Sequence, residues 1–406
     1  MKRMKVWLLV LVIGVASCTG VKEAAFERGV DLFLANQLQD ASKLLEASVT
    51  LMPGNPEAFA WYAECLRRMG EYDRAAEFAY GALKIDPDHA FAHAVLGDLF
   101  NPMYSTWSRV NAESTWFHLL AAVKSDPHDG NAWLALWPQT IMRGETDLEV
   151  TADTMMIATG FLTEPLLAYN RWMLRDLPEN AILITNGDFD TFPAVALQKR
   201  EGLRQDVAIF NLNLLNVDWY AHAIAERYGI ELPFDQAELQ NLQSYRNKSG
   251  KVITKAIQIV RGWFDMLGRG QLTRPLCLAI TVERKGIISD VEEHTVLCGA
   301  YYEVTPGKGD RIDLERVARS IEELEVSDFE GSFYSDMDRS PIRRATANNL
   351  AANLTGLMLI YASELLDRGQ SEEARQVVEK ARIFDTSIAA RGRFTTQIDS
   401  LLRRRS

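Results

Sequence analysis

Two carboxylates follow a short apolar run, and this is the segment of the chain best suited to chemistry. Asp188 and Asp190 are separated by one residue, and Asn186, Gly187 and Thr191 flank them. Carboxylates this close on one turn could chelate a metal ion or serve as an acid and a base. A glycosidase pair, however, flanks its substrate with about 5 to 9 Å between the carboxyl groups, which one tight loop provides poorly. No catalytic residue is therefore assigned, and we expect this loop to bind a ligand.

A second polar and aromatic cluster supports that expectation. It follows the next apolar run and comprises Asn216, Asp218, Trp219 and Tyr220. In an open parallel sheet, ligands bind in the crevice outside the carboxyl ends of the strands, so the two loops are expected to share a crevice. Helix capping is the alternative explanation, because the polar side chains of both clusters can accept hydrogen bonds from the first amides of the following helices.

The elements around these loops predict a small α/β domain. Residues 181–185 and 206–215 are apolar and typical of strands, and 191–202 between them is typical of a helix. A strand, a helix and a strand at this spacing predict a right-handed crossover with parallel strands. Further helices are expected over 218–229 and 252–267, and single strands over 275–282 and 294–304. We place this domain at residues 176–310.

A regular repeat organises the N-terminal part, with a period of about 34 residues. Pro53 and Pro87 end two successive units, and small or apolar residues recur between them at the crossing points of paired helices. This pattern resembles the tetratricopeptide repeat. The third unit closes only at Pro127, so it is longer than the others, and the extra residues lie near 101–107. Trp133 occupies the aromatic position of a fourth unit, and residues 355–384 repeat the helical spacing near the C-terminus.

The predicted fold class is therefore α/β plus α-helical repeats. It has an N-terminal tetratricopeptide solenoid, a small α/β domain with a parallel βαβ core, and a C-terminal tetratricopeptide-like helical hairpin. The expected boundaries are a signal peptide at 1–17, the solenoid at 18–175, the α/β domain at 176–310 and the C-terminal helical region at 311–406.

The N-terminus predicts a lipid anchor. Lys2, Arg3 and Lys5 precede an apolar run over 6–15, which is too short to span a bilayer, and small residues then lead to Cys18. This arrangement is that of a bacterial lipobox, in which lipid is attached to the cysteine; the alternative is an ordinary signal peptide with a chance cysteine. Thr19 and not Asp follows the cysteine, and the resemblance to Gram-negative lipoproteins then implies anchoring on the periplasmic side of the outer membrane.

A second resemblance covers residues 177–384. Its motifs are the stretch from Gly187 to Pro193, the stretch from Asn211 to Asn216, and the Trp219-Tyr220 pair. They are similar to the soluble C-terminal part of bacterial multi-spanning membrane proteins grouped with protein O-mannosyltransferase-like glycosyltransferases. This chain departs at Phe189, where that family usually has Asn. The family's transferase chemistry is assigned to its membrane-spanning half, so the resemblance implies a shared accessory module outside the cytoplasm.

Other chemistry finds little support. The formal charge of -11 disfavours nucleic-acid partners. Cys277 and Cys298 are expected as buried small residues, or as a disulfide in an oxidising compartment. His89 and His93 could share a helix face, yet no third metal ligand is evident. Tryptophans could line a sugar-binding face, although helix packing is the better explanation. No cofactor is expected.

These observations favour binding over catalysis. We expect a lipid-anchored periplasmic scaffold that contacts a protein or peptide partner in the envelope and a possible glycan, accessory to glycosylation or envelope assembly. The alternative is an envelope carbohydrate-active or metal-dependent enzyme that uses the loop containing Asp188 and Asp190, and a third option is a structural spacer.

Overall fold

The computed structural model describes residues 22–283, 287, 291–307, 310–389 and 392–403. The chain divides into two compact units, residues 22–139 with 337–345, and residues 140–336 with 346–403. The boundaries expected from the sequence at 176 and 311 stay predictions, and the expected signal peptide and Cys18 lie outside the described residues. Within the described ranges, no helix combines the length and apolar character needed to cross a bilayer.

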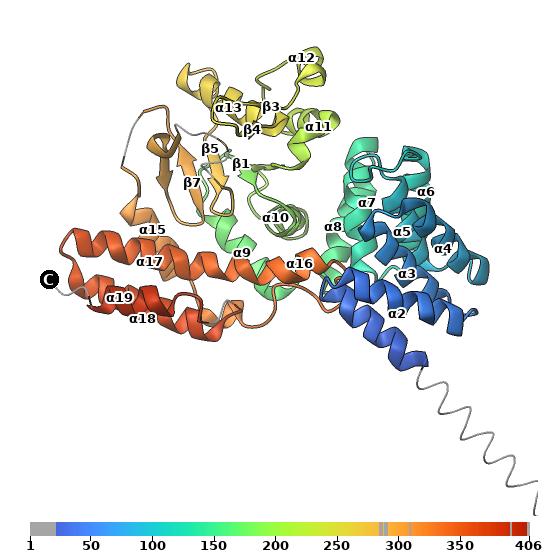
Figure 1. Ribbon diagram of the computed structural model, residues 1–406. Helices are drawn as coiled ribbons and strands as arrows, with labels where there is room; N and C mark the ends of the chain where they lie inside the picture. Colours follow the sequence, from blue (N-terminus) through green and yellow to red (C-terminus); the bar gives the residue numbers. More distant parts are fainter. Residues whose placement is uncertain (1–21, 284–286, 288–290, 308–309, 390–391, 404–406) are drawn as a thin grey trace, which may run out of the picture. The chain divides into compact units, whose positions relative to one another are not determined.

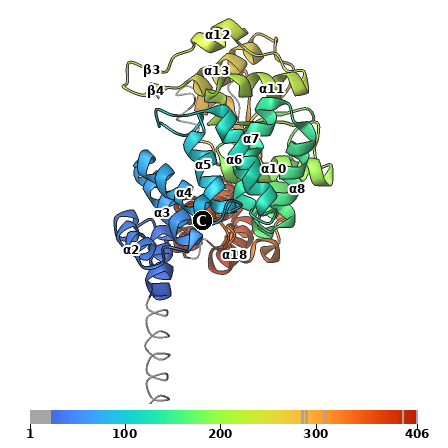
Figure 2. The ribbon, with the colours of Figure 1, turned by 90° about the vertical axis from the view of Figure 1, so that its right-hand side faces the viewer.

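The first unit is a series of helix pairs (Figures 1 and 2). A helix over residues 22–34 packs on α2 (Leu38–Leu51), since a Cβ atom on Gly29 would lie 3.1 Å from Leu45 Cδ2. Further pairs follow: α3 (Pro56–Met69) with α4 (Tyr72–Ile85), and α5 (Ala90–Phe100) with α6 (Ala112–Ser125). The helix α7 (Gly130–Arg143) starts in this unit. Figure 2 shows α2 to α6 following one another as a stack.

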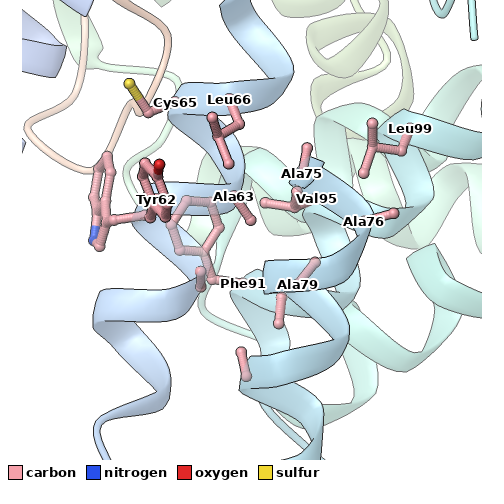
Figure 3. Close-up of a cluster of buried hydrophobic side chains, with 14 of the residues drawn as sticks. Tyr62, Ala63, Cys65, Leu66, Ala75, Ala76, Ala79, Phe91, Val95 and Leu99 are labelled. Atoms are coloured by element: carbon pink, nitrogen blue, oxygen red, sulfur yellow. The ribbon is translucent and has the colours of Figure 1, made fainter. Parts of the chain in front are cut away.

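Small residues make the helix pairing possible. A Cβ atom on Gly97 would lie 2.5 Å from Leu119 Cδ2, and one on Gly81 would lie 2.7 Å from Phe59 Cδ1. A larger side chain at either position would separate the helices. Figure 3 shows the resulting core, in which alanines of α4 face aromatic and aliphatic residues of α3 and α5. Small residues at these helix crossings therefore allow the paired helices to approach closely.

The insertion expected in the third unit is the irregular segment between α5 and α6. It packs on the neighbouring repeat, since Trp107 Nε1 donates to Asp73 Oδ1 at 3.2 Å and Tyr72 Oη lies 3.0 Å from Thr106 Oγ1. Trp107 is buried, and so are Trp133, Trp137 and Trp172. Helix packing thus accounts for these rings, and they do not form an exposed sugar-binding face.

The second unit is built on a five-stranded sheet. Its strands are β1 (Ile182–Thr185), β2 (Ala208–Asn211), β5 (Leu276–Ala279), β6 (Thr295–Leu297) and β7 (Tyr301–Val304), in the order β2-β1-β5-β7-β6. β1 pairs in parallel with β2 and with β5, which confirms the predicted parallel crossover. β1, β2 and β5 are buried along their whole length, as parallel strands covered on both faces must be.

The single strand expected over 294–304 is wrong. The segment is a tight antiparallel hairpin of β6 and β7, in which Cys298 N donates to the carbonyl of Tyr301 at 3.0 Å. Gly299 permits the turn because its φ of 121° lies in a region that other residues rarely adopt. The sequence predicted one strand because the residues around the turn are apolar and a single glycine is the only turn residue among them.

Helices cover both faces of the sheet. The crossover α10 (Asp188–Glu201) packs against α8 (Thr146–Ala158) and α9 (Glu164–Arg175). The chain returns from β2 to β5 on the other side of β1, so a right-handed connection puts α11 (Asp218–Tyr228) and α13 (Lys255–Gly268) on the opposite face from α10, as Figure 1 shows. The short helix η1 (Leu214–Asn216) precedes α11, and α12 (Gln236–Asn241) and a small hairpin of β3 (Tyr245–Arg246) and β4 (Val252–Ile253) lie between α11 and α13.

The remaining elements are helical. They comprise η2 (Val291–His294), α15 (Leu314–Glu322), η3 (Val326–Phe329), α16 (Pro341–Thr346), η4 (Ala347–Leu350), α17 (Ala351–Asp367), α18 (Ser371–Ser387) and α19 (Thr395–Arg403). α17 and α18 form the helical hairpin expected near the C-terminus, with Gly369 at φ 79° in the turn and Ala362, Ala374 and Ala381 buried between the helices.

Candidate functional site

The loop after β1 is organised by one of its two carboxylates. Helix α10 starts at Asp188, so Asp190 is its third residue. The Asp190 carboxylate accepts hydrogen bonds from the backbone N–H groups of Asn186 and Gly187, both at 2.8 Å, and from the hydroxyl of Thr281. Thr281 follows β5, so Asp190 joins the loops at the carboxyl ends of β1 and β5.

Asp190 is buried at this junction, with 2% of its surface exposed. Burial raises the pKa of the Asp190 carboxyl above its ordinary value, and the hydrogen bonds from Asn186, Thr281 and Gly187 offset part of that rise. Both carboxylate oxygens are engaged within the fold. Asp188 is half-buried at the start of the helix. The two carboxylates therefore have different environments, and Asp190 is poorly placed to bind a metal ion.

A buried polar network lies directly beneath this loop. Thr191 Oγ1 is 2.6 Å from Thr185 Oγ1 and accepts a hydrogen bond from Asn211 Nδ2 at 3.0 Å. Asn211 Oδ1 accepts from the backbone of Asn213 at 2.9 Å, and Asn211 N donates to the Tyr220 hydroxyl at 3.1 Å. Burial raises the pKa of Tyr220 well above its ordinary value. Thr191 and Tyr220 thus belong to the packed interior of the unit.

The second polar cluster is linked to α13. Asn216 Oδ1 accepts a hydrogen bond from Ala256 N at 3.1 Å, and Lys255 Nζ forms an ion pair with Asp218. The following helix α11 has Val217 at its N-cap and no side-chain capping bond there. The alternative in which Asn216 or Asp218 caps the following helix is therefore wrong, because these side chains reach the start of a helix much later in the chain.

The structure does bring the two predicted loops together. Asn213 Nδ2 donates to the carbonyl of Asn186 at 2.8 Å, which joins residues 186–191 to residues 211–220. We call these two segments the strand-end loops. Asn186, Asn216 and Asp218 are exposed, and Trp219 is half-buried beside Tyr220. Gly187 is extended and has room for a side chain, since the nearest atom to an added Cβ would be Asn213 Nδ2 at 3.8 Å. The two loops are therefore joined by hydrogen bonding at the carboxyl ends of β1 and β2.

A cavity of about 540 Å³ lies elsewhere in this unit, at the C-terminal end of α11. Its lining includes His222, Glu226 and Phe234, and none of the strand-end loop residues. Within the described residues, no group of three or more His, Cys, Asp or Glu side chains could hold a metal ion.

The cysteines and histidines have ordinary structural environments. Cys277 and Cys298 are buried free thiols, so the alternative with a disulfide between them is not formed in this structure, and burial raises the pKa of Cys298 to about 11. His89 caps α5 by accepting from Ala92 N at 3.2 Å. His93 Nδ1 lies 2.9 Å from His118 Nδ1 in the interior.

A set of residues that the sequence did not point to forms a second candidate site. Glu57, Phe91 and Asn131 are each the second residue of their helices, α3, α5 and α7. They occupy one position in three successive repeats, the last spacing being longer because of the insertion between α5 and α6. Together with Asp129, which caps α7 by accepting from Asn131 N at 3.0 Å, we call them the repeat face.

The repeat face holds a distant segment of the same compact unit, residues 337–345. Asn131 binds its backbone in two places, because Nδ2 donates to the Met337 carbonyl at 2.8 Å and Oδ1 accepts from Arg339 N at 3.1 Å. The Arg339 guanidinium pairs with Asp129 at 2.6 Å and lies 4.2 Å from the centre of the Phe91 ring. The site therefore combines amide recognition of a backbone with a charged and aromatic pocket for one arginine.

Glu57 adds negative charge to the face. Burial alone would raise the pKa of Glu57, but hydrogen bonds from His89 and Trp61, together with the charge of Arg339, lower that pKa below its ordinary value. A carboxylate at this position thus stays ionised and favours a cationic side chain nearby. The period of the repeats was the only signal in the sequence that could have found these positions.

Two protein-family models match parts of the chain. Residues 32–99 match a tetratricopeptide repeat family, and residues 167–248, which include the strand-end loops, match TMEM260-associated domain 2. No curated protein matches the sequence.

One solved structure that is similar is described as "Structure of Naa15/Naa10 bound to HypK-THB". The identity is 14% and the TM-score 0.31, over 94% of this chain and 39% of that chain. The chain thus spans well under half of that protein, and a similarity this low does not bear on function. The family match over 32–99 shows that the chain contains tetratricopeptide repeats, which are an interaction scaffold.

Proposed function

We propose that this protein is a lipid-anchored scaffold of the bacterial cell envelope that holds a protein partner on its tetratricopeptide repeats. The observation that carries the proposal is the repeat face, where Asn131, Asp129 and Phe91 already hold a segment remote in sequence through its backbone and one arginine. A surface able to hold a chain segment in this way is suited to peptide recognition.

The anchoring part of the proposal rests on the N-terminal sequence. Lipid on Cys18 would retain the chain on the periplasmic side of a membrane, the outer membrane by the residue that follows. A Cys18→Ser variant should lose incorporation of an alkyne-labelled fatty acid and move from the membrane to the soluble fraction. Labelling of the variant at the level of the wild type would contradict lipidation at Cys18.

The α/β unit contributes a second surface in this proposal. Its resemblance to the soluble part of O-mannosyltransferase-like membrane proteins supports a role accessory to glycosylation or envelope assembly, with a glycan or protein at the strand-end loops. The engagement of Asp190 within the fold supports binding over a carboxylate-based enzyme. In this proposal the α/β unit binds a partner and catalyses no reaction.

A site-specific crosslinking experiment tests the scaffold. A photoreactive amino acid placed at Glu57, which is partly exposed on the repeat face, should yield a discrete adduct with an envelope protein. The same residue placed at Ile360, which is exposed on α17, serves as the control. Equal adduct patterns from both positions, or none from position 57, would contradict a partner on the repeats.

A further inference from the structure

The segment 337–345 occupies the repeat face in the way that a bound peptide would. It is remote in sequence from Asp129 and Asn131, yet its contacts are those of a ligand: two hydrogen bonds to its backbone, one ion pair and one ring contact. These contacts converge on Met337 and Arg339. From this geometry we propose that residues 337–345 are an internal ligand, and that the partner peptide of the repeats carries an arginine and competes with it.

The charges of the face select the chemistry of the peptide. The Asp129 carboxylate is 5% exposed and pairs with a guanidinium that is 21% exposed, so both groups are largely removed from water. A buried carboxylate without its partner is unfavourable, because its hydration is not replaced. Glu57 adds a second negative charge, and the flat Phe91 ring suits the planar guanidinium better than a lysine ammonium.

The segment is held ready in its bound shape by its own contacts. Asp338 is buried and accepts hydrogen bonds from Ser340 N at 2.8 Å and from the Arg343 guanidinium at 2.7 and 2.9 Å. Arg343 Nη2 also reaches Asn131 Oδ1 at 3.3 Å. A preorganised segment loses less conformational freedom on binding, so it competes strongly while it is part of the chain.

This inference rests on the proposed function and adds the identity of the recognised group and its regulation. An occupied face binds a second peptide only in the fraction of molecules whose segment is released, so the apparent affinity falls by that fraction. A partner with the same arginine contact would displace residues 337–345 from the face. The repeats and their internal ligand would then form a switch between a closed and a loaded scaffold.

A peptide added in trans tests the proposal. The full chain in detergent micelles is titrated into a fluorescent peptide with the chain's own sequence from Tyr334 to Ala347. We expect weak binding to the wild type and at least about tenfold tighter binding to Arg339→Ala, whose internal ligand has lost its anchor. Arg339→Lys should lie between them, and Lys43→Ala, which removes an exposed charge on α2, should match the wild type.

Two further measurements make the result decisive. The peptide with alanine in place of Arg339 should not bind, and the double variant Arg339→Ala/Asp129→Asn should lose the gained affinity while its circular dichroism matches that of Arg339→Ala. Equal peptide binding by wild type and Arg339→Ala, or binding that survives the Asp129 change, overturns the internal ligand. If the photoreactive residue at position 57 still captures an envelope protein in that case, the scaffold stands and only its regulation is wrong.

Discussion

The strand-end loops and the repeat face are both polar clusters at the starts of helices, but their polar groups bind different kinds of partner. In the loops, Asp190 and Asn216 satisfy amides within the same α/β unit and hold its own connections together. On the repeat face, Asn131 and Asp129 hold an arginine and a backbone that arrive from a segment near the other end of the chain. Polar residues that close a fold and polar residues that hold a ligand are thus distinguished by their partners.

Asp190→Ala should produce the largest change. It leaves the N–H groups of Asn186 and Gly187 and the hydroxyl of Thr281 without their buried acceptor. Loss of a buried, charged acceptor of several bonds should lower the free energy of unfolding by about 3 kcal/mol. Urea denaturation measures this. A loss below about 1 kcal/mol would mean that Asp190 does not hold the loops together, and that the contrast with the repeat face is weaker than proposed.

Acid should destabilise the helices of the repeats before it destabilises the α/β unit, and this is the next largest expected effect. His93 Nε2 donates to the Pro87 carbonyl, so His93 Nδ1 accepts from His118, and protonation of both rings would place two cations in contact. Burial lowers the pKa of His118 to about 4. The unfolded chain protonates His118 more readily than the folded chain does. The free energy of unfolding should therefore decrease as the pH falls below about 6.5, by roughly 2 kcal/mol at pH 5.

The dependence of stability on pH has the opposite sign for Asp190 in the strand-end loops. The raised pKa of Asp190 means that the folded unit binds a proton more readily than the unfolded chain, so this group's contribution falls as pH rises through its folded pKa. Hydrogen exchange resolved by peptide, between pH 7 and 5, should show earlier loss of protection in α5 and α6 than in α10. Loss of protection first in α10 would contradict both assignments.

The sequence could predict what is local or periodic. The spacing of Pro53 and Pro87 reports a repeated helix pair, and the two apolar runs at 181–185 and 206–215 report parallel strands, because each signal lies within a few turns of the chain. The placement of the strand-end loops at one sheet edge followed from that topology. Their hydrogen-bond partners did not, since Ala256 and Thr281 are brought there by later crossovers.

The repeat face was missed for the same reason. Asn131 and Asp129 look like ordinary helix-start residues in the sequence, and capping is indeed one role of Asp129. Their second role depends on Arg339, and no period or motif connects it to them. A contact between positions this far apart in the chain leaves no local trace in a single sequence, so the structure is required to find it.

Asn131→Ala should have an intermediate effect that is confined to the repeat unit. It removes both backbone hydrogen bonds to residues 337 and 339, so the segment should open locally at a cost of about 1–2 kcal/mol in stability. Limited proteolysis after Arg339 or Arg343 measures the opening. Asn241→Ala, which removes an exposed amide on α12, is the matched control. Unchanged cleavage in Asn131→Ala would show that the amide contacts do not hold the segment.

Asp188→Ala should have the smallest effect on stability and the most direct bearing on the comparison. Asp188 is at the first position of α10 and is half-buried, so water can replace more of what its carboxylate contacts, and its loss should cost about 0.5 kcal/mol, measured by the same urea titration as for Asp190→Ala. Its neighbour two residues on should cost several times more, although both are aspartates in one turn. If Asp188→Ala is instead as damaging as Asp190→Ala, both carboxylates hold the fold together, and the exposed Asn186, Asn216 and Asp218 of these loops are left to contact a ligand. If the variant is stable but loses crosslinks to an envelope component, the strand-end loops hold a ligand as the repeat face does, and the two regions differ only in what they bind.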